Sequence, residues 1–247
     1  MSENNSRTFD LITLGQLLLR LSPPNNERLM RCDTFEKQVG GAELNVAVGV
    51  SLLGLHTGII SKLPSHDVGS FMKGKIRSYG VSDDFFIYDK SPSARVGIYY
   101  YENGAYPRKP KVIYDRANSS FYSLKIDEIP EEVYSATKCF HTSGITLALN
   151  PQVRETAIEM IKRFKAAGTL VSFDVNFRGN LWTGAEAKEC IERILPYVDI
   201  FFCSEDTARL TFLKTGTARE MMKSFAQEYP ISIVAATQRI VHSPKRH

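Results

Sequence analysis

The sequence is poor in the features that mark disulfide-rich, metal-binding or membrane proteins. Its four cysteines include no Cys-x-x-Cys pair, and its five histidines show no ligand spacing. This argues against a disulfide framework or a zinc site and fits a reducing compartment, so we expect a cytoplasmic protein. No apolar run approaches the length that spans a bilayer, and residues 1–6 are polar. We therefore expect neither a membrane segment nor a signal peptide.

The sequence also lacks a strong excess of charge of either sign. The net charge is +4, and the lysines and arginines are scattered along the chain. We therefore expect no nucleic-acid partner, although a mild positive charge suits an anionic substrate. Hydrophobic residues make up 43% and charged residues 23% of the 247 positions, which is typical of a globular domain with a sizeable core.

The most informative stretch is a pair of glycines directly before a helix. Gly40 and Gly41 precede apolar residues with helical spacing that begin at Leu44. Glycine has no Cβ, so the backbone N–H groups can approach a ligand closely, and a helix start adds unpaired donors and a positive dipole end. An ordinary strand-to-helix turn has the same pattern. Here Glu43 and Asn45 place polar groups in the first turn, which favours a binding site.

The second half of the chain alternates short apolar strands with helices. Strands are expected at 138–142, 170–174, 200–203 and 231–235. Helices are expected to begin near Asn150, Thr183 and Glu205. The spacing is that of βαβ units, and continuous apolar strands indicate a sheet covered on both faces. We predict the α/β class with a doubly wound, mostly parallel sheet, whose ligands bind beyond the carboxyl ends of the strands.

A region of different composition interrupts this pattern. Residues 84–115 hold aromatic and β-branched runs separated by turns, with no long helix between them. With the apolar run near 17–20, they predict a small antiparallel β lid inserted into a single domain over residues 1–247. Edge strands of the main sheet are the alternative. Because such a lid exposes a face around Tyr100, we expect a homo-oligomer formed through the lid.

Polar residues at the end of strand 170–174 are candidates for chemistry. Asp174, Asn176 and Arg178 alternate along an extended segment, so they point to one side. Arginine can hold a carboxylate or phosphate with two parallel hydrogen bonds. Alternatively, Asp174 and Arg178 pair with each other or cap the next helix. Arg116, after the tyrosine-rich lid strands, is a second candidate for contact with a sugar-sized anion.

Two groups of residues resemble known signatures. The stretch 40–47, with Leu53-Gly54 and Asp67-Val68-Gly69, resembles the first signature of the ribokinase-like (PfkB) carbohydrate kinases. The strand end 174–178, followed by Leu181-Trp182, resembles the 2-keto-3-deoxygluconate kinases of that family. The resemblance covers essentially the whole chain.

The resemblance implies transfer of the ATP γ-phosphoryl group to a primary hydroxyl of 2-keto-3-deoxygluconate, with ATP and Mg²⁺ as cofactors and no implied set of metal ligands. The substrate-binding residues that it implies are Gly40, Gly41, Asn45, Tyr99, Tyr114, Arg116 and Arg178. The implied nucleotide-binding residues are Asn176, Arg178, Ser204 and Thr237. The two arginines would hold the substrate carboxylate, and a lid would exclude water from the phosphoryl donor.

The sequence departs from the family pattern in two places. The second signature, a Gly-Ala-Gly-Asp-like turn with the catalytic Asp, does not occur in the 247 residues. The expected base lies beyond His247, so the chain resembles the first three quarters of a kinase, with the C-terminal part of the fold missing. The Asn-x-x-Glu motif is replaced by residues 203–207, where Glu205 or Asp206 could substitute.

These departures leave several functions open. We expect the chain as given to be inactive, and we expect Asp174 to have a structural role, because Asn176 and Arg178 would stabilise its ionised form and lower its basicity. One alternative is another sugar kinase of the family, such as a fructokinase or ribokinase. The other is a sugar-acid-binding protein without catalytic activity.

Overall fold

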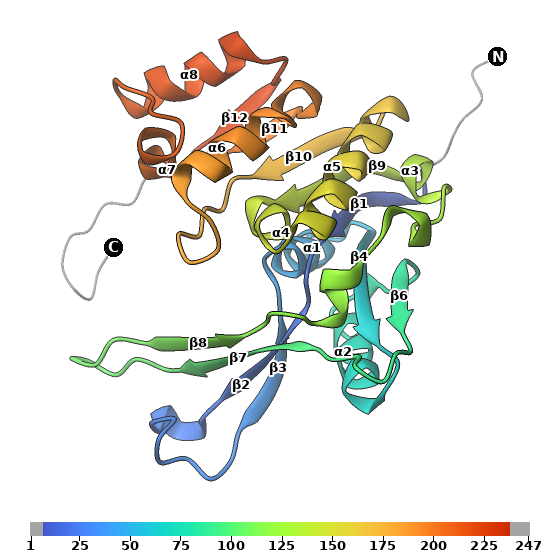
Figure 1. The fold of residues 1–247 in the computed structure, drawn as a ribbon, viewed down its shortest axis with the longest axis vertical. Helices are drawn as coiled ribbons and strands as arrows, with labels where there is room; N and C mark the ends of the chain where they lie inside the picture. Colours follow the sequence, from blue (N-terminus) through green and yellow to red (C-terminus); the bar gives the residue numbers. More distant parts are fainter. Residues whose placement is uncertain (1–6, 238–247) are drawn as a thin grey trace.

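A reversal of strand order divides the main sheet of this protein. The computed structural model describes residues 7–237, and Figure 1 shows a large sheet flanked by helices with a small sheet projecting from it. The main sheet contains β1 (Phe9–Leu14), β4 (Thr57–Pro64), β5 (Val81–Ser82), β6 (Phe86–Asp89), β9 (Thr137–Ser143), β10 (Leu170–Asp174), β11 (Ile200–Phe202) and β12 (Ile233–Ala235).

All pairings in the main sheet are parallel, and the order is β12-β11-β10-β9-β1-β4-β5, with β6 also beside β4. The chain adds β4 to β5 on one side of β1 and β9 to β12 on the other. The predicted α/β class with a mostly parallel sheet is confirmed. The order reverses between β1 and β9, and ligands bind at such a point because the chain connections diverge there.

The helices predicted to begin near Asn150, Thr183 and Glu205 are present. The helices are α1 (Ala42–Leu52), α2 (Asp67–Arg77), α3 (Val133–Ala136), α4 (Gly144–Ala148), α5 (Pro151–Ala166), α6 (Gly184–Glu192), α7 (Glu205–Leu210) and α8 (Ala218–Glu228). The Asn150 side chain accepts a hydrogen bond from the Val153 N–H at the start of α5, and Thr183 caps α6. Such caps satisfy N–H groups that the first turn leaves unpaired. Within residues 7–237, no helix has both the length and the apolar character needed to cross a membrane.

The small sheet is built from four strands and is called the lid sheet below. Its order is β3 (Glu36–Gly40), β2 (Leu18–Ser22), β7 (Gly97–Glu102) and β8 (Lys111–Asp115). The β2–β3 and β7–β8 pairs are antiparallel, whereas β2 and β7 run parallel. The lid sheet is therefore mixed and not purely antiparallel. In Figure 1, β7 and β8 extend away from the main sheet.

The predicted boundaries of the lid need correction. The interval 84–115 does not belong wholly to the lid, because β6 pairs with Ser61–Pro64 of β4. Phe86 of β6 packs against the core formed by α1, α2 and β4, so its apolar side chain is used by the main sheet. β3, in contrast, was not predicted as a lid strand. Its first three residues are exposed and polar, so no apolar alternation marks it.

The buried histidine His141 on β9 makes the stability of the fold dependent on pH. Its side chain is 4% exposed, and its Nδ1 lies 2.9 Å from the Ser172 hydroxyl. Burial lowers the pKa of His141 to about 4. In the unfolded chain this pKa is about 6.5, so the unfolded state takes up a proton first as the pH falls. The stabilisation is complete above pH 6.5 and is lost on the way down to about pH 4.

We expect the free energy of unfolding to fall by roughly 3 kcal/mol from His141 alone between pH 6.5 and 4. Urea denaturation across this range, with His141→Gln compared with the unchanged chain, measures the effect. The variant should show a shallower decline, whatever its absolute stability. Equal pH slopes for the two proteins would contradict the assignment.

Candidate active site

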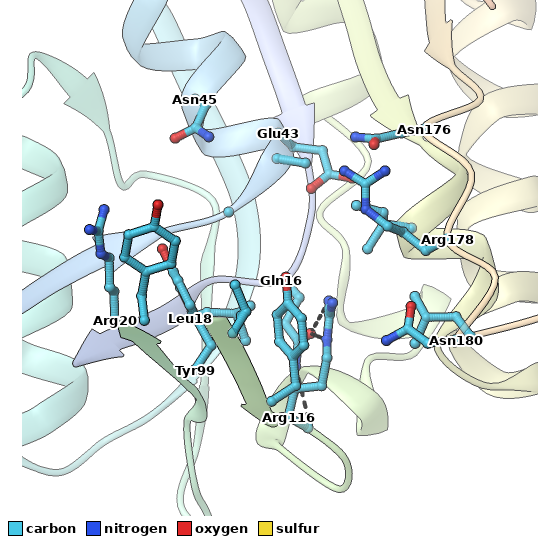
Figure 2. A pocket seen from close by; sticks show the side chains of 17 residues that line it. Gln16, Leu18, Arg20, Glu43, Asn45, Tyr99, Arg116, Asn176, Arg178 and Asn180 are labelled. Atoms are coloured by element: carbon cyan, nitrogen blue, oxygen red, sulfur yellow. Dashed lines mark hydrogen bonds between the residues drawn. The ribbon is translucent and has the colours of Figure 1, made fainter. Parts of the chain in front are cut away.

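A cavity of about 540 Å³ lies between the lid sheet and the carboxyl ends of the central strands (Figure 2). Its walls come from the segment after β1, the start of α1, three lid strands, α4 and the segment after β10. The lining residues are Gln16, Leu18, Arg20, Gly41, Ala42, Glu43, Asn45, Tyr99, Tyr101, Val112, Tyr114, Arg116, Ile145, Asn176, Arg178, Asn180 and Leu181. The cavity thus occupies the point where strand order reverses.

The two glycines have different roles. Gly41 lines the cavity, and a Cβ there would lie 2.9 Å from the backbone oxygen of Gln16. Gly40 is not among the lining residues, but a Cβ on it would lie 2.6 Å from the Tyr99 hydroxyl oxygen. Gly40 therefore acts by allowing Tyr99 to approach the chain, and Gly41 allows the start of α1 to pack against the end of β1.

The lid contributes an aromatic wall. Tyr99 on β7 pairs in register with Tyr114 on β8, and their ring centres are 5.9 Å apart. Burial raises the pKa of the Tyr99 hydroxyl, so this group stays protonated and can donate a hydrogen bond. Asn45 of α1 is exposed and lines the same cavity. Such a mixture of ring faces and hydrogen-bonding groups suits a sugar.

Arg116 and Arg178 line the same cavity from opposite elements. The Nε and Nη2 atoms of Arg116 donate to Gln16 Oε1 at 2.9 and 2.6 Å, and its guanidinium carbon is 5.6 Å from the ring centre of Tyr114. Burial lowers the pKa of Arg116, and the charge of Arg178 adds to this effect. Arg178 is exposed, and its Nη1 donates to the Phe177 carbonyl at 3.0 Å. The structure therefore brings both predicted arginines to one cavity.

Glu43 is the acidic side chain among the lining residues. It is 1% exposed, and its Oε1 accepts hydrogen bonds from the Ser143 hydroxyl at 2.6 Å and the Thr146 hydroxyl at 2.9 Å. Burial raises the pKa of Glu43, although these two bonds and the charge of Arg116 lower it in part. Glu43 joins the first turn of α1 to the end of β9 and to α4.

Several lining residues were not in the predicted site. Glu43 was recognised only as a polar group in the first helical turn, whereas Gln16, Arg20 and Asn180 were not singled out. Gln16 lies in the connection between β1 and β2 and Arg20 lies on β2, and only the geometry of these strands brings the two side chains to the cavity. The alternation of β2, which turns Leu18 and Arg20 to one side, was the available signal.

A second cavity of about 460 Å³ lies beyond the carboxyl ends of β10, β11 and β12. Its lining residues are Asp174, Asn176, Phe177, Arg178, Phe202, Cys203, Ser204, Thr207, Ala235, Ala236 and Thr237. All four predicted nucleotide-binding residues are in this set. The two cavities share Asn176 and Arg178, so these residues form a common wall. Asn176 has φ 35°, a left-handed conformation that asparagine tolerates better than most residues.

Asp174 differs from the sequence-based expectation. It lines the second cavity and not the first, and its Oδ1 accepts a hydrogen bond from the Asn176 N–H at 2.9 Å. Burial raises the pKa of Asp174, outweighing the lowering by this bond and by the Arg178 charge. The expectation of lowered basicity was wrong because it ignored the loss of solvation at the strand end.

The acidic residues at the start of α7 do not line the second cavity. Glu205 forms an ion pair with Arg209 at 2.8 Å, and Asp206 is exposed. Thr207, one turn into the helix, lines the cavity instead. Among residues 7–237, no group of three or more His, Cys, Asp or Glu side chains is placed to hold a metal ion.

Comparisons with known proteins agree with this geometry. Residues 9–238 match the model of the pfkB family of carbohydrate kinases. A 2-dehydro-3-deoxygalactonokinase of Haloferax volcanii is 35% identical over 94% of this chain, which spans 72% of that relative's length.

Two solved structures show the same fold. A 2-dehydro-3-deoxygluconokinase from Thermotoga maritima superposes with a TM-score of 0.86 at 33% identity, covering 94% of this chain and 71% of that chain. An uncharacterised sugar kinase from Pyrococcus horikoshii, solved in complex with ATP, has a TM-score of 0.72 at 27% identity, covering 82% of this chain and 66% of that chain. The family match spans almost all described residues, and the solved structures share the fold. The chain therefore belongs to the pfkB family of ATP-dependent carbohydrate kinases.

Proposed function

We propose that this protein is a sugar-acid kinase that transfers the γ-phosphoryl group of ATP to 2-keto-3-deoxygluconate. The observation that supports this proposal most directly is the pair of cavities that share Asn176 and Arg178 as a common wall. The first cavity offers sugar-binding groups and arginines, and the second extends over the neighbouring strand ends. The names of the Haloferax and Thermotoga relatives, both kinases of 2-dehydro-3-deoxy sugar acids, support the substrate class.

In the first cavity, Arg116 and Arg178 pair with the substrate carboxylate. Arginine suits this task because its planar guanidinium forms two parallel bonds with a carboxylate. Asn45, Tyr99 and the backbone at Gly41 donate to hydroxyl groups, which fixes the sugar for attack. A neutral sugar, the substrate of the alternative fructokinase or ribokinase, leaves the arginines without an anionic partner, which disfavours that function.

In the second cavity, Asn176, Arg178, Ser204 and Thr237 contact ATP. The carboxylate of Asp174 and the hydroxyl of Thr207 add oxygen atoms, the ligand type that Mg²⁺ prefers, so this lining fits an ATP-bound Mg²⁺. Mg²⁺, when bound, neutralises negative charge on the phosphates. Arg178, on the common wall, is placed to stabilise charge on the transferred group.

All four cysteines are free, in keeping with a cytoplasmic protein.

Removing either arginine is expected to weaken binding of the sugar acid selectively. Arg116→Ala should cost about 2–4 kcal/mol, because a partly buried charge pair loses one partner. Arg178→Ala should cost less, because Arg178 is exposed. Isothermal titration calorimetry with 2-keto-3-deoxygluconate and with D-fructose measures both. Arg219→Ala, an exposed position on α8, is the control. Equal losses of binding free energy for the two ligands would show that the arginines do not recognise the carboxylate.

We expect the 247-residue chain by itself to lack appreciable ATP-dependent kinase activity. The family's Gly-Ala-Gly-Asp-like turn, with its catalytic Asp and anion hole, does not occur in this sequence. Phosphoryl transfer needs a group that accepts the hydroxyl proton and donors that stabilise the transferred charge. A coupled assay of ADP release tests this, with calorimetry of the same sample showing that the sugar acid still binds.

Robust turnover that Asp174→Asn abolishes would contradict this expectation and assign the base to Asp174. Sugar-acid binding without turnover is the expected result for the 247 residues alone. If turnover stays absent when the chain is extended by any downstream segment of its own coding sequence, the non-catalytic binding protein is the better description.

We also propose that two copies associate through the lid sheet. β8 is exposed along its whole length, including Val112, Ile113 and Tyr114. A long exposed edge strand with apolar side chains is a ready partner for a second copy. Sedimentation at micromolar concentration should show a dimer, and Ile113→Lys should shift it to the monomer. A wild-type monomer under these conditions would refute the lid contact.

A further inference from the structure

Gln16 is a buried polar residue whose side-chain amide forms hydrogen bonds through both its nitrogen and its oxygen. It lies between β1 and β2 and is 3% exposed. Its Nε2 donates to the Ser119 hydroxyl at 2.7 Å and to the Arg116 carbonyl at 3.2 Å, while its Oε1 accepts the two bonds from the Arg116 guanidinium. Figure 2 shows the hydrogen bonds between Gln16 and Arg116 in the first cavity. The four bonds fix the amide at both ends.

The contact fixes the orientation of Arg116. Within residues 7–237, the side-chain hydrogen bonds of Arg116 go to the single oxygen Oε1 of Gln16. Two N–H groups on adjacent nitrogen atoms that converge on one acceptor define the plane of the guanidinium. Rotation about the Nε–Cζ bond would break at least one of these bonds. The guanidinium therefore meets a ligand in one orientation, which lowers the entropy cost of binding.

The group that accepts the Arg116 hydrogen bonds, the Gln16 amide oxygen, is uncharged, so it leaves the positive charge of Arg116 in the cavity. A glutamate side chain has the same length as glutamine and could accept the same two bonds, but it would neutralise Arg116. With glutamine, the lining includes the cations Arg20, Arg116 and Arg178 against the acid Glu43 alone. Glu43 is itself buried and held by two hydroxyl groups. Arg116 thus keeps a positive charge that an anionic ligand can pair with.

We propose that Gln16 is a positioning residue that orients Arg116 and, by remaining uncharged, makes the cavity select an anionic sugar over a neutral one. The inference rests on the proposed sugar-acid substrate and assigns the source of its charge selectivity. Gln16 acts through Arg116, so its removal affects the carboxylate end of the ligand and not the hydroxyl contacts at Asn45 and Tyr99.

Two substitutions separate the charge of Gln16 from its hydrogen bonds. Gln16→Glu keeps an acceptor for the Arg116 guanidinium and adds a negative charge, and it also loses the donation from Nε2 to the Arg116 carbonyl. Gln16→Met keeps the length and removes the hydrogen bonds. Gln227→Glu, at an exposed position on α8, makes the same chemical change far from the cavity and is the matched control. Binding of 2-keto-3-deoxygluconate and D-fructose to the full chain is measured by calorimetry.

We expect Gln16→Glu to weaken sugar-acid binding by about tenfold or more, which is about 1.4 kcal/mol or more, with less than about a twofold change for fructose. Gln16→Met should weaken sugar-acid binding by a smaller factor, since Arg116 keeps its charge and loses its fixed orientation. Gln227→Glu should leave both affinities unchanged. Equal weakening of both ligands by Gln16→Glu would overturn the selectivity role.

Nuclear magnetic resonance of the arginine side chains tests the positioning without a ligand. In the unchanged chain, the Arg116 guanidinium should give separate Nη signals because rotation about Nε–Cζ is slow, and Gln16→Met should merge them. The signals are assigned by their absence in Arg116→Lys. Merged signals in the unchanged chain would overturn the positioning role. Failure of the unchanged chain to bind the sugar acid would instead refute the proposed substrate, and the two failures are thus distinguishable.

Discussion

The reversal of strand order between β1 and β9 is the constraint on which the rest of the structure depends. Parallel strands need crossover connections, and the connections that follow β1 and β9 run to opposite sides of the sheet, so neither covers the space between the carboxyl ends of these strands. The gap is bridged by side chains instead. Glu43 at the start of α1 accepts hydrogen bonds from Ser143 at the end of β9 and from Thr146 on α4. This buried carboxyl group ties the two halves of the sheet together directly under the first cavity.

The same reversal explains why the cavity is lined by segments far apart in sequence. Gln16 leads from β1 into the lid, Glu43 begins the helix that returns from it, and Arg116 follows the last lid strand. The lid sheet and the main sheet thus meet at one place. Arg116, partly buried there with an uncharged acceptor, carries an unfavourable desolvation cost that a bound anion offsets.

The sequence predicted the features that local patterns encode. The βαβ spacing located β9 to β12, and the cap residues Asn150 and Thr183 located two helix starts, because capping depends on a few adjacent residues. The stretches 41–45 and 174–178, each contiguous in sequence, contribute lining residues to the two cavities. Contacts between residues far apart in the sequence were not predicted. β6 and the lid strands have similar aromatic composition, and only the pairing of β6 with β4 distinguishes them. Burial at Asp174 was equally invisible, and it reversed the expected direction of the pKa shift.

β8 illustrates how one strand serves two surfaces. Val112 and Tyr114 line the sugar-sized cavity, whereas Lys111 and Ile113 line a separate hollow near the lid tip. This division follows from the two-residue period of a strand. Even-numbered and odd-numbered positions can therefore vary independently, one set with the ligand and the other with the outer surface. The length of the connection between β7 and β8 is constrained for the same reason, because a one-residue slip in register would exchange the two sets and turn Tyr114 out of the cavity.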